Sequence, residues 1–537
     1  MRANRFQGEK LLGGWFKEGS AFLKKAYNNT ISRIRTHMKV YLIGAGPGDP
    51  GLLTLKGKEI LERADVVVYD YLASDSLLTH ARPDAECIYV GKKGGDHTLS
   101  QSGINQLIID KAKEDKIVAR LKGGDPYMFG RGGEEAEELL EAGVPFEVVP
   151  GVTSAIAGPA YAGIPLTHRA HASSVCFATG HEDPTKPESA HNWDALAKGT
   201  STLVFFMGMK NLPYIAEKLT QAGMPASTPA ALVHWGTTSR HRSLVSTLQN
   251  LPSEAEKQNF TAPSLIIVGG VVTLHDKLNW FEQLPLLGKT IVVTRAREQA
   301  SASADLMTSL GAEVIQFPTI TIEPLKDYGD VQPELAKLNE YNWVIFTSVN
   351  SVRHFWHQLG LAGKDSRALG SCAIAAVGPA TAKALQDKGI VPDFIPEKFV
   401  AEDIADGLLK LGMKGKKVLL PRARVARDVL PEALEKAGAT LKVLPIYETL
   451  PCAKNQERVL SAIAENSLDC ITFGSSSTVT NFLSLVPVET LKKHPEIKLG
   501  CIGPVTAKTL KEAGLECDIM PEDYTIPALV EELVKKL

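Results

Sequence analysis

The first residues that suggest chemistry are the glycines of GAGPGDPG at 44–51, which follow the apolar run Val40–Ile43. A dinucleotide fingerprint reads G-x-G-x-x-G, whereas this loop has Pro47 inside it and Asp49 in the place of the last glycine. Proline removes one N–H from a phosphate cradle, and an aspartate repels a pyrophosphate. The loop therefore disfavours a nicotinamide enzyme. It favours a cationic cofactor without phosphate, of which the sulfonium S-adenosylmethionine is an example.

Two serine-rich turns in the second half suggest anion binding. FTSVNS begins at Phe346 and FGSSS at Phe473, and each precedes a run with helical spacing. A helix start presents free N–H groups, which suit carboxylates or phosphates. Simple capping by the serines at 348, 351, 475 and 477 is the alternative. Because the turns are matched, and matched again by GPATA at 378–382 and GPVTA at 503–507, both interpretations stay open.

The elements that position these loops alternate along the chain. Apolar, β-branched runs such as 66–69, 117–121 and 202–206 alternate with helical spacing from residue 38 onward, which predicts an α/β protein. Glycine and proline cluster where the runs end, as in GGDP at 123–126 and PGVTSA at 150–155. Ligand sites of open α/β sheets lie at the carboxyl ends of strands, so these turns are site candidates.

The second half contains an internal repeat. GKTIVVTRAR begins at Gly288 and GKKVLLPRAR at Gly415, an offset of 127 residues that Phe346 and Phe473 share. The pattern predicts two similar α/β units, each opening with a strand and an arginine-bearing loop.

Composition excludes several classes of protein. The 537 residues predict three or four globular units, and 59 basic against 61 acidic residues give no overall field for nucleic acid. The apolar runs are shorter than the ~20 residues that span a bilayer. Seven cysteines without a CxxC pair indicate neither a disulfide framework nor a metal site. We therefore predict a cytoplasmic protein without a metal, a nucleic-acid partner or a membrane span.

Residues 1–37 differ from the rest, with eight basic and two acidic side chains. They predict a poorly ordered tail before a natural start at Met38. A targeting or membrane-surface helix is the alternative.

Six strings in the first half are specific to a family. They are GAGPGDPGLLTLKG (44–57), VVVYDYL (66–72), VGKKGG (90–95), RLKGGDPYMFGRGGEE (120–135), VVPGVTSAIAGPAYAGIPLTHR (148–169) and TGH (179–181). They resemble the uroporphyrinogen-III C-methyltransferases of the tetrapyrrole methylase family. The resemblance implies a two-lobed methylase over 38–285, S-adenosylmethionine as cofactor and a homodimer.

The same resemblance implies roles for single residues. Those implied for the cofactor site are Pro47, Gly123, Gly124, Asp125, Met128, Thr153, Ser154, Met207 and Gly236. Asp125 would accept a hydrogen bond or face the cation. Asp70 is implied as proton acceptor and Lys92 as proton donor, with a helix cap and a solvated loop charge as the alternatives. A substrate with eight carboxylates needs cations, and the candidates are Arg120, Lys122, Arg131, His168 and Arg169.

The repeat-bearing half, 286–537, resembles uroporphyrinogen-III synthase in six further strings. They are FTSVNSV (346–352), VGPATAKAL (377–385), LLPRARVARDVLPEAL (419–434), IYETL (446–450), FGSSSTV (473–479) and IGPVTAKTL (502–510). The family fold is two flavodoxin-like lobes joined by a β-ladder. That implies one lobe from 288–319 and 451–537, a second at about 325–442, and a ladder of 317–323 with 443–450. Tyr447 is implied as the catalytic phenol, and the substrate carboxylates would meet the turns at Thr347, Ser348, Gly378, Ser475, Ser476 and Gly503.

Together the resemblances predict a bifunctional enzyme of tetrapyrrole biosynthesis. The second half, a lyase, would close hydroxymethylbilane to uroporphyrinogen III with inversion of one pyrrole. The first half would methylate that product twice to precorrin-2, on the way to cobalamin or sirohaem. The alternative is a methylase of another corrinoid precursor fused to a non-catalytic tetrapyrrole-binding module.

Overall fold

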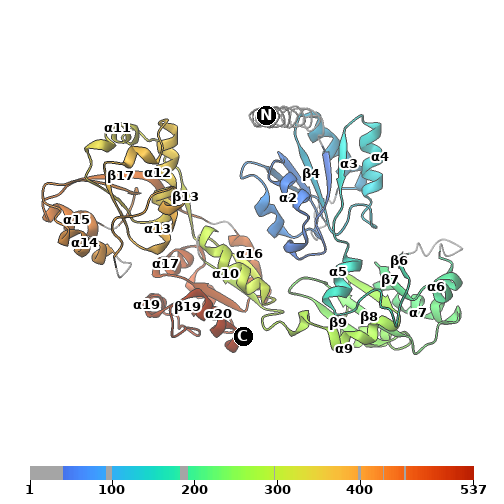
Figure 1. Cartoon of the computed structure of the whole chain (residues 1–537). Helices are drawn as coiled ribbons and strands as arrows, with labels where there is room; N and C mark the ends of the chain where they lie inside the picture. The colour runs from blue at the N-terminus through green and yellow to red at the C-terminus, as the bar shows by residue number, and fades with distance from the viewer. Residues whose placement is uncertain are drawn as a thin grey trace, which may run out of the picture. The chain divides into compact units, whose positions relative to one another are not determined.

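The computed structural model describes residues 40–91, 99–181, 191–294, 297–396, 401–426, 428–452 and 455–537. Two compact units divide the chain (Figure 1). Unit 1 comprises Met1–Lys289 and Ser309–Glu313, and unit 2 comprises Thr290–Thr308 and Val314–Leu537. The predicted tail at 1–37 and the predicted proton donor Lys92 lie outside the described residues.

Unit 1 begins with a five-stranded parallel sheet in the order β3-β2-β4-β1-β5. Its strands are β1 (Val40–Gly44), β2 (Val66–Tyr69), β3 (Glu86–Tyr89), β4 (Val118–Lys122) and β5 (Phe146–Val149). Strands β1 and β4 are buried along their whole length, as expected for a parallel sheet covered on both faces. The carboxyl ends of β1, β2, β4 and β5 therefore meet at one edge.

Helices cover both faces of this sheet (Figure 1). Val40 and Leu42 of β1 pack in one core with α3 (Gln101–Lys113) and α4 (Gly132–Glu141). Tyr41 and Ile43 pack in the other core with α2 (Leu55–Leu61) and the 3-10 helix η2 (Asp75–His80). Alternate residues of β1 thus serve opposite faces, which is the period of a strand.

A second, mixed sheet completes unit 1, in the order β6-β7-β10-β8-β9. Its strands are β6 (Val175–Thr179), β7 (Thr202–Phe206), β8 (Pro229–His234), β9 (Arg242–Thr247) and β10 (Ser264–Val268). Helix α5 (Ser154–Tyr161) leads from the first sheet to the second. The other helices of this part are α6 (Trp193–Gly199), η3 (Met209–Asn211), α7 (Leu212–Gln221), α8 (Leu251–Lys257), η4 (Gly270–Leu274), α9 (His275–Leu278) and η5 (Phe281–Gln283), and η1 (Pro50–Leu52) follows β1.

Unit 2 contains two sheets in which four strands follow the same order, and the second sheet has β13 as an additional edge strand. One has the order β12-β11-β18-β19, built from β11 (Thr290–Val293), β12 (Glu313–Gln316), β18 (Cys470–Phe473) and β19 (Lys498–Cys501). The other has the order β13-β17-β16-β14-β15, built from β13 (Ile320–Glu323), β14 (Trp343–Phe346), β15 (Ala373–Ala376), β16 (Lys417–Ala423) and β17 (Thr440–Pro451). The predicted α/β class and flavodoxin-like lobes are confirmed.

The two lobes exchange halves of the sequence repeat. Strands β11 and β12 belong to the first repeat, yet they share a sheet with β18 and β19 of the second. Strands β14 and β15 of the first repeat pair in turn with β16 and β17 of the second. Each lobe therefore combines the first part of one repeat with the second part of the other.

The predicted β-ladder is present but shorter than expected. Strand β13 pairs antiparallel with the end of β17, from Ile320 opposite Pro451 to Glu323 opposite Glu448. The earlier part of β17, up to Tyr447, pairs with β16 instead, with a register shift at Ala423.

Helices surround both lobes of unit 2. They are α10 (Arg297–Ser309), α11 (Val331–Ala336), η6 (Leu338–Glu340), α12 (Val349–Leu361), η7 (Ser366–Leu369), α13 (Pro379–Gln386), α14 (Ala401–Lys410), α15 (Val429–Lys436), α16 (Gln456–Ala464), α17 (Ser476–Leu485), α18 (Val488–Lys492), α19 (Pro504–Glu512) and α20 (Ile526–Lys536). Of the helices that the structure describes, none is long and apolar enough to cross a membrane.

Candidate active sites

The strand-end loops of the first sheet touch backbone to backbone. Gly124 donates its amide to the Gly46 carbonyl at 2.7 Å, and Gly46 donates back at 3.2 Å. A Cβ placed on Gly151 would lie 2.3 Å from the carbonyl oxygen of Gly124, and one on Gly44 would lie 2.4 Å from Gly151 Cα. Side chains are excluded here, so the loops after β1, β4 and β5 form one glycine-lined surface.

The second sheet contributes to the same surface. The Asp49 amide donates to Thr237 Oγ1 at 3.1 Å, and Tyr161 Oη donates to Asp49 Oδ2 at 2.5 Å. Burial and the Asp49 carboxylate raise the pKa of Tyr161, so the phenol remains a donor. The loop after β8, with Gly236, therefore lies against the loop that carries Pro47. The Phe206 ring, next to Met207, contacts Phe129 in the loop after β4, with centroids 4.8 Å apart.

Backbone strain concentrates in these loops. Among the described residues, nine non-glycine residues have a positive φ. Five of them lie here, namely Phe129, Arg131, Met207, Trp235 and Thr237. Such conformations persist only where the surroundings impose them, and they cluster at functional sites. This signal marks the surface as a site independently of any family.

Asp125 joins two of the loops. Its Oδ1 accepts from the Tyr127 amide at 2.8 Å, and its Oδ2 accepts from the Gly151 amide at 3.0 Å. Both carboxylate oxygens thus accept from backbone amides of the chain itself. The carboxylate fastens the loop after β4 to the loop after β5. Close by, Thr153 is buried and Ser154 begins α5.

Asp70 directly follows β2 beside this surface and does not cap a helix. Its Oδ1 accepts from the Leu72 amide at 3.2 Å, within a turn that precedes η2. Its Oδ2 accepts from Arg120 Nη2 at 3.1 Å. A Cβ on Gly123 would lie 2.5 Å from Leu72 Cβ, so the turn that carries Asp70 packs against the cofactor-loop candidates.

Two of the five predicted cations are inaccessible to a substrate. Arg120 and Lys122 point to the same side of β4 and are only 3% and 4% exposed. Both contact the buried Glu135, whose Oε1 lies 3.3 Å from Arg120 Nε and 2.6 Å from Lys122 Nζ. Burial, and the charge of Arg120, lower the pKa of Lys122, although Glu135 opposes that shift. Sequence reasoning missed Glu135, but two cations on one face of a buried strand require such a partner.

The remaining cations are on the surface. His168 and Arg169 are exposed, and so is Arg131. Arg131 contacts Glu134 through Nε at 3.0 Å and Nη2 at 2.6 Å. That pairing raises the pKa of Arg131, and a substrate carboxylate at the edge of the loop after β4 would compete with Glu134 for the guanidinium.

The serine turns of unit 2 are helix caps. Ser348 Oγ accepts from the Ser351 amide at 3.0 Å, and Ser351 Oγ accepts from the Ser348 amide at 3.2 Å. Ser475 and Thr478 form the same reciprocal pair at the start of α17. The amides of Ser348 and Ser475 are thus engaged within their own helices. Thr347 is half-buried before the first cap.

The second pair of matched turns is also present. Gly378 and Gly503 are buried extended residues that begin α13 and α19, each followed by proline. In one lobe Ser476 Oγ donates to the Val505 carbonyl at 3.2 Å, which joins the serine turn to the GPVTA turn. In this lobe, therefore, the start of α17 lies beside the start of α19.

Tyr447 lies where β17 leaves one lobe. Its Oη is 3.1 Å from Ser348 Oγ, and the ring is 7% exposed. Burial raises the pKa of Tyr447, opposed in part by the Ser348 contact, so the phenol is protonated at neutral pH. It can therefore donate a proton or a hydrogen bond.

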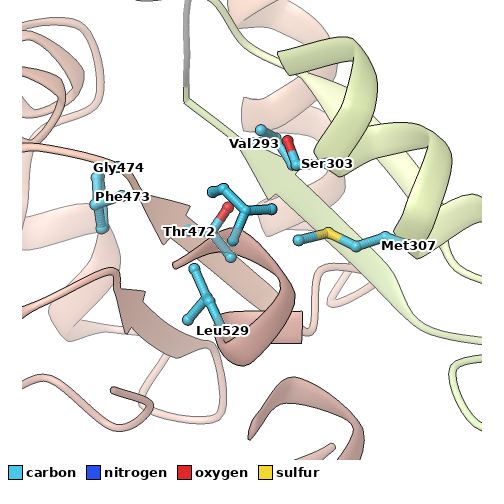
Figure 2. Close-up of a pocket in the computed structure, with 8 residues that line it drawn as sticks. Val293, Ser303, Met307, Thr472, Phe473, Gly474 and Leu529 are labelled. Atoms are coloured by element: carbon cyan, nitrogen blue, oxygen red, sulfur yellow. The ribbon is translucent and has the colours of Figure 1, made fainter. Parts of the chain in front are cut away.

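Figure 2 shows a small cavity between β11, β18, α10 and α20. It is lined by Val293, Ser303, Met307, Thr472, Phe473, Gly474, Ile526 and Leu529. About 10 Å³ is open to the centre of a water molecule. That volume holds one water at most, so the cavity is a packing gap and not a ligand site. Within the described ranges no three His, Cys, Asp or Glu side chains gather as metal ligands.

Comparison with known proteins matches both halves of the chain. Residues 39–252 match the family model of tetrapyrrole (corrin/porphyrin) methylases, and residues 301–531 match that of uroporphyrinogen-III synthase HemD. A porphyrin biosynthesis protein HemD of Ruminiclostridium josui is 38% identical over 502 residues, which cover 93% of this chain and 98% of that protein.

Two further similar proteins match the first half alone. The S-adenosyl-L-methionine-dependent uroporphyrinogen III methyltransferase of Methanosarcina barkeri is 54% identical over 240 residues, 45% of this chain and 94% of that protein. The crystal structure of a uroporphyrin-III C-methyl transferase from Thermus thermophilus, complexed with S-adenyl homocysteine, is 39% identical, covers 44% of this chain and 99% of its own, and has a TM-score of 0.38.

The fold and the loops define an α/β enzyme of two units, a methylase followed by a synthase with interleaved lobes. The chain belongs to the family in which a tetrapyrrole methylase is joined to a uroporphyrinogen-III synthase.

Proposed function

We propose that unit 2 closes hydroxymethylbilane to uroporphyrinogen III with inversion of one pyrrole, and that unit 1 methylates this product twice on carbon to give precorrin-2. The observation that carries the methylation is the place of Asp70, a carboxylate at a strand end whose turn packs against a glycine-lined surface. The full-length likeness to one porphyrin biosynthesis protein supports the pairing of the two reactions in one chain.

S-adenosylmethionine fits the glycine-lined surface as the cofactor. A Cβ on Gly124 would have only Thr153 Cα and Ser154 N within 4 Å, both at 3.8 Å, so space is open beside this backbone. The residues that would hold the cofactor are Pro47, Gly123, Gly124, Met128, Thr153, Ser154, Met207 and Gly236, with Asp125 fixing the loops. When bound, S-adenosylmethionine supplies an electrophilic methyl group on a sulfonium. Met207, 54% exposed, offers a soft apolar contact.

Asp70 is the proton acceptor in this proposal. A substituted pyrrole carbon that gains a methyl group becomes quaternary, and the sulfonium leaves as a neutral thioether while the ring is left with a positive charge. A base discharges that charge by removing a proton from the ring N–H or from the adjoining methylene bridge, and the electrons of that bond form the new double bond. Each oxygen of Asp70 has one donor, from Leu72 or from Arg120, and keeps a second lone pair. Lys92, outside the described residues, is proposed as the proton donor. Arg131 is proposed to meet a substrate carboxylate.

In unit 2, Tyr447 is proposed to donate a hydrogen bond to the departing hydroxyl of hydroxymethylbilane. With a proton taken from the phenol or from solvent, the hydroxyl leaves as water and takes the electrons of the C–O bond with it. The azafulvene cation that remains forms a bond to a substituted pyrrole carbon, whose older bridge bond then breaks so that this pyrrole is inverted. The half-buried Ser348 beside the phenol supports this role. Substrate carboxylates are proposed to meet the helix starts near Thr347, Gly378, Ser476 and Gly503.

The cellular compartment and the oligomeric state also belong to the proposal. All seven cysteines are free, which supports a reducing compartment such as the cytoplasm. Ile156 of α5, Leu278 and Trp280 are each about half exposed in unit 1, which supports a homodimer through this unit. Sedimentation of the full chain tests the homodimer.

The test of the proposed function uses the intact protein with hydroxymethylbilane and S-adenosylmethionine. The expected product has the mass of a dimethylated ring and the type III isomer pattern. A type I ring would show that unit 2 does not invert the pyrrole, and an unmethylated type III ring would exclude the first half of the proposal. Residues 286–537 alone, given hydroxymethylbilane, distinguish a synthase from a binding module, since a binding module leaves the spontaneous type I product.

A further inference from the structure

A buried network of charges lies beneath the proposed base. Asp70, Arg120, Glu135 and Lys122 are linked in that order by contacts of 3.1, 3.3 and 2.6 Å. Two cations face two anions, so the set is neutral. Asp70 is its accessible end, with a side chain that is 26% exposed, whereas Glu135 is only 1% exposed.

Arg120 is held from several directions. Its Nη1 donates to the carbonyls of Leu121 and Val68 at 3.0 and 3.5 Å, its Nε to Glu135 and its Nη2 to Asp70. Arg120 of β4 is the pairing partner of Val68 in β2. Its side chain extends past Val68 to Asp70, two residues further along. The Leu121 and Val68 carbonyls and the Glu135 carboxylate leave the guanidinium little freedom to turn. They therefore fix the direction of its fourth hydrogen bond, the one to Asp70.

Glu135 orients the arginine in turn. Its Oε1 accepts from Arg120, from Lys122 and from Gln101 Nε2 at 3.0 Å. Glu135 belongs to α4 and Gln101 to α3, so both helices that cover this face of the sheet share in the network. The strand that carries Arg120 and Lys122 continues directly into Gly123 and Gly124. The network therefore connects the Asp70 carboxylate to the strand that carries a cofactor loop.

We infer that Arg120 is a positioning residue for methylation: anchored on Glu135, it holds the Asp70 carboxylate in the orientation that accepts the substrate proton. This inference rests on the proposed function, because it assumes that Asp70 is the base. Asp70 follows the last residue of β2, and among the described residues the Leu72 amide is the one other hydrogen-bond donor to its carboxylate. Without Arg120 its Oδ2 would turn freely, and a displacement of about 1 Å typically costs on the order of 10²-fold in rate.

The experiment is a double-mutant cycle in the full chain. Arg120→Lys keeps the charge of the network, but an ammonium cannot bridge Asp70, Glu135 and two carbonyls at once. The variants are Arg120→Lys, Asp70→Asn and the two combined. For each we would measure the initial rate of uroporphyrinogen III methylation, the KM for that substrate, the Kd for S-adenosylmethionine and the melting temperature.

Arg120→Lys is expected to lower kcat roughly 10- to 100-fold, with KM and the cofactor Kd within about twofold. In the Asp70→Asn background, Arg120→Lys should lower kcat by less than about twofold, because the carboxylate that Arg120 positions is no longer present. Arg82→Lys is the matched control. Arg82 also bridges two carboxylates, Asp65 and Asp84, but at the opposite ends of the strands, so the full rate is expected.

Several outcomes would overturn the inference. One is a full rate for Arg120→Lys, and another is an equal fractional loss in both backgrounds. A cofactor Kd that weakens as much as the rate would mean that Arg120 supports the loop and not the base. If Asp70→Asn itself retains the full rate, the base assignment in the proposed function fails with it. A slow Asp70→Asn beside a fast Arg120→Lys removes the positioning role alone.

Asp70→Glu is a second test for the case in which Arg120→Lys does not fold. The added methylene moves the carboxylate by about 1.5 Å at a partly exposed position, so folding should survive. A loss of kcat of about tenfold or more is expected although the base is still a carboxylate. A full rate for Asp70→Glu would contradict the need for positioning.

Discussion

The imidazole of His354 stacks on the phenol of Tyr447, with ring centroids 5.2 Å apart and planes inclined by 26°. Burial lowers the pKa of His354, so the stacked imidazole is neutral at neutral pH. The repeat places Asn481, in the other lobe, at the position equivalent to His354, and Ile320, in the crossing strand β13, at the position equivalent to Tyr447. Of two lobes with the same strand order, only one thus carries this aromatic pair, and an activity of the phenol would belong to that lobe.

Tyr447→Phe tests the phenol. If Tyr447 assists departure of the hydroxyl, its loss should lower the initial rate of uroporphyrinogen III formation by ~10²–10³, the usual effect of one donor to a developing charge. Phenylalanine keeps the stacking on His354, so the melting temperature should stay within a degree or two. A variant with nearly full rate would mean that backbone groups at the helix starts fold the substrate and that Tyr447 only packs.

Asp70→Asn tests the base. Methylation should fall by ~10²–10⁴, because asparagine accepts no proton, while S-adenosylmethionine binding measured by calorimetry should stay nearly unchanged. The amide can keep an acceptor toward Arg120 and the Leu72 amide, so the fold should remain. Near-normal methylation would leave Asp70 as a turn-forming residue only.

Gly124→Val tests the cofactor loop. Gly124 has φ +69°, which a β-branched residue rarely adopts, and its Cβ would enter the open space beside Thr153 and Ser154. Cofactor affinity should fall by at least about tenfold. Gly143→Val is the matched control, since Gly143 has φ +68° with no atom within 4 Å of its Cβ and lies away from these loops. Equal affinities in two folded variants would show that the loop assignment is wrong.

The pH dependence of the unfolding free energy tests whether the partners of Glu282 stabilise its ionised carboxylate. Its oxygens accept from Ser243 Oγ and Asn279 Nδ2, each at 2.6 Å, and lie 3.3 Å from His241 Nε2. Burial alone would raise the pKa of Glu282, but these partners outweigh it and hold the pKa at about 2, below the ordinary 4.5. The stability that results is present above about pH 4.5 and is lost as the pH falls toward 2.

Glu282→Gln removes this dependence and is the comparison variant. The difference in unfolding free energy between wild type and variant should be about 1–3 kcal/mol at pH 7, a value reduced for the partial exposure of the carboxylate. Urea unfolding at pH 7, 4 and 3 should show that difference shrinking as the pH falls. A constant difference over this range would mean that the partners do not stabilise the ionised form.

The sequence predicted the strand ends and the repeat, because hydrophobic periodicity and glycine-proline clusters are local signals. The exchange of repeat halves between the lobes came from the family resemblance alone, because the spacing of Gly288 and Gly415 does not tell which strands pair. The sequence placed Arg120 and Lys122 near the right loops but assigned them to the substrate. The alternation along β4 buries both, and their partner Glu135 comes from a helix whose packing the sequence does not state.

The exchange of halves between the lobes has a consequence for synthesis on the ribosome. Strand β11 pairs with β18, and the Thr290 amide donates to Asp469 across 179 residues. The lobe that is begun first is therefore finished last, after the other lobe has been completed in between. At ~5–20 residues per second, β11 and β12 wait roughly 10 to 35 s for their partners. During that interval the nascent chain exposes an unpaired strand edge, which is a template for pairing with other chains until β18 emerges.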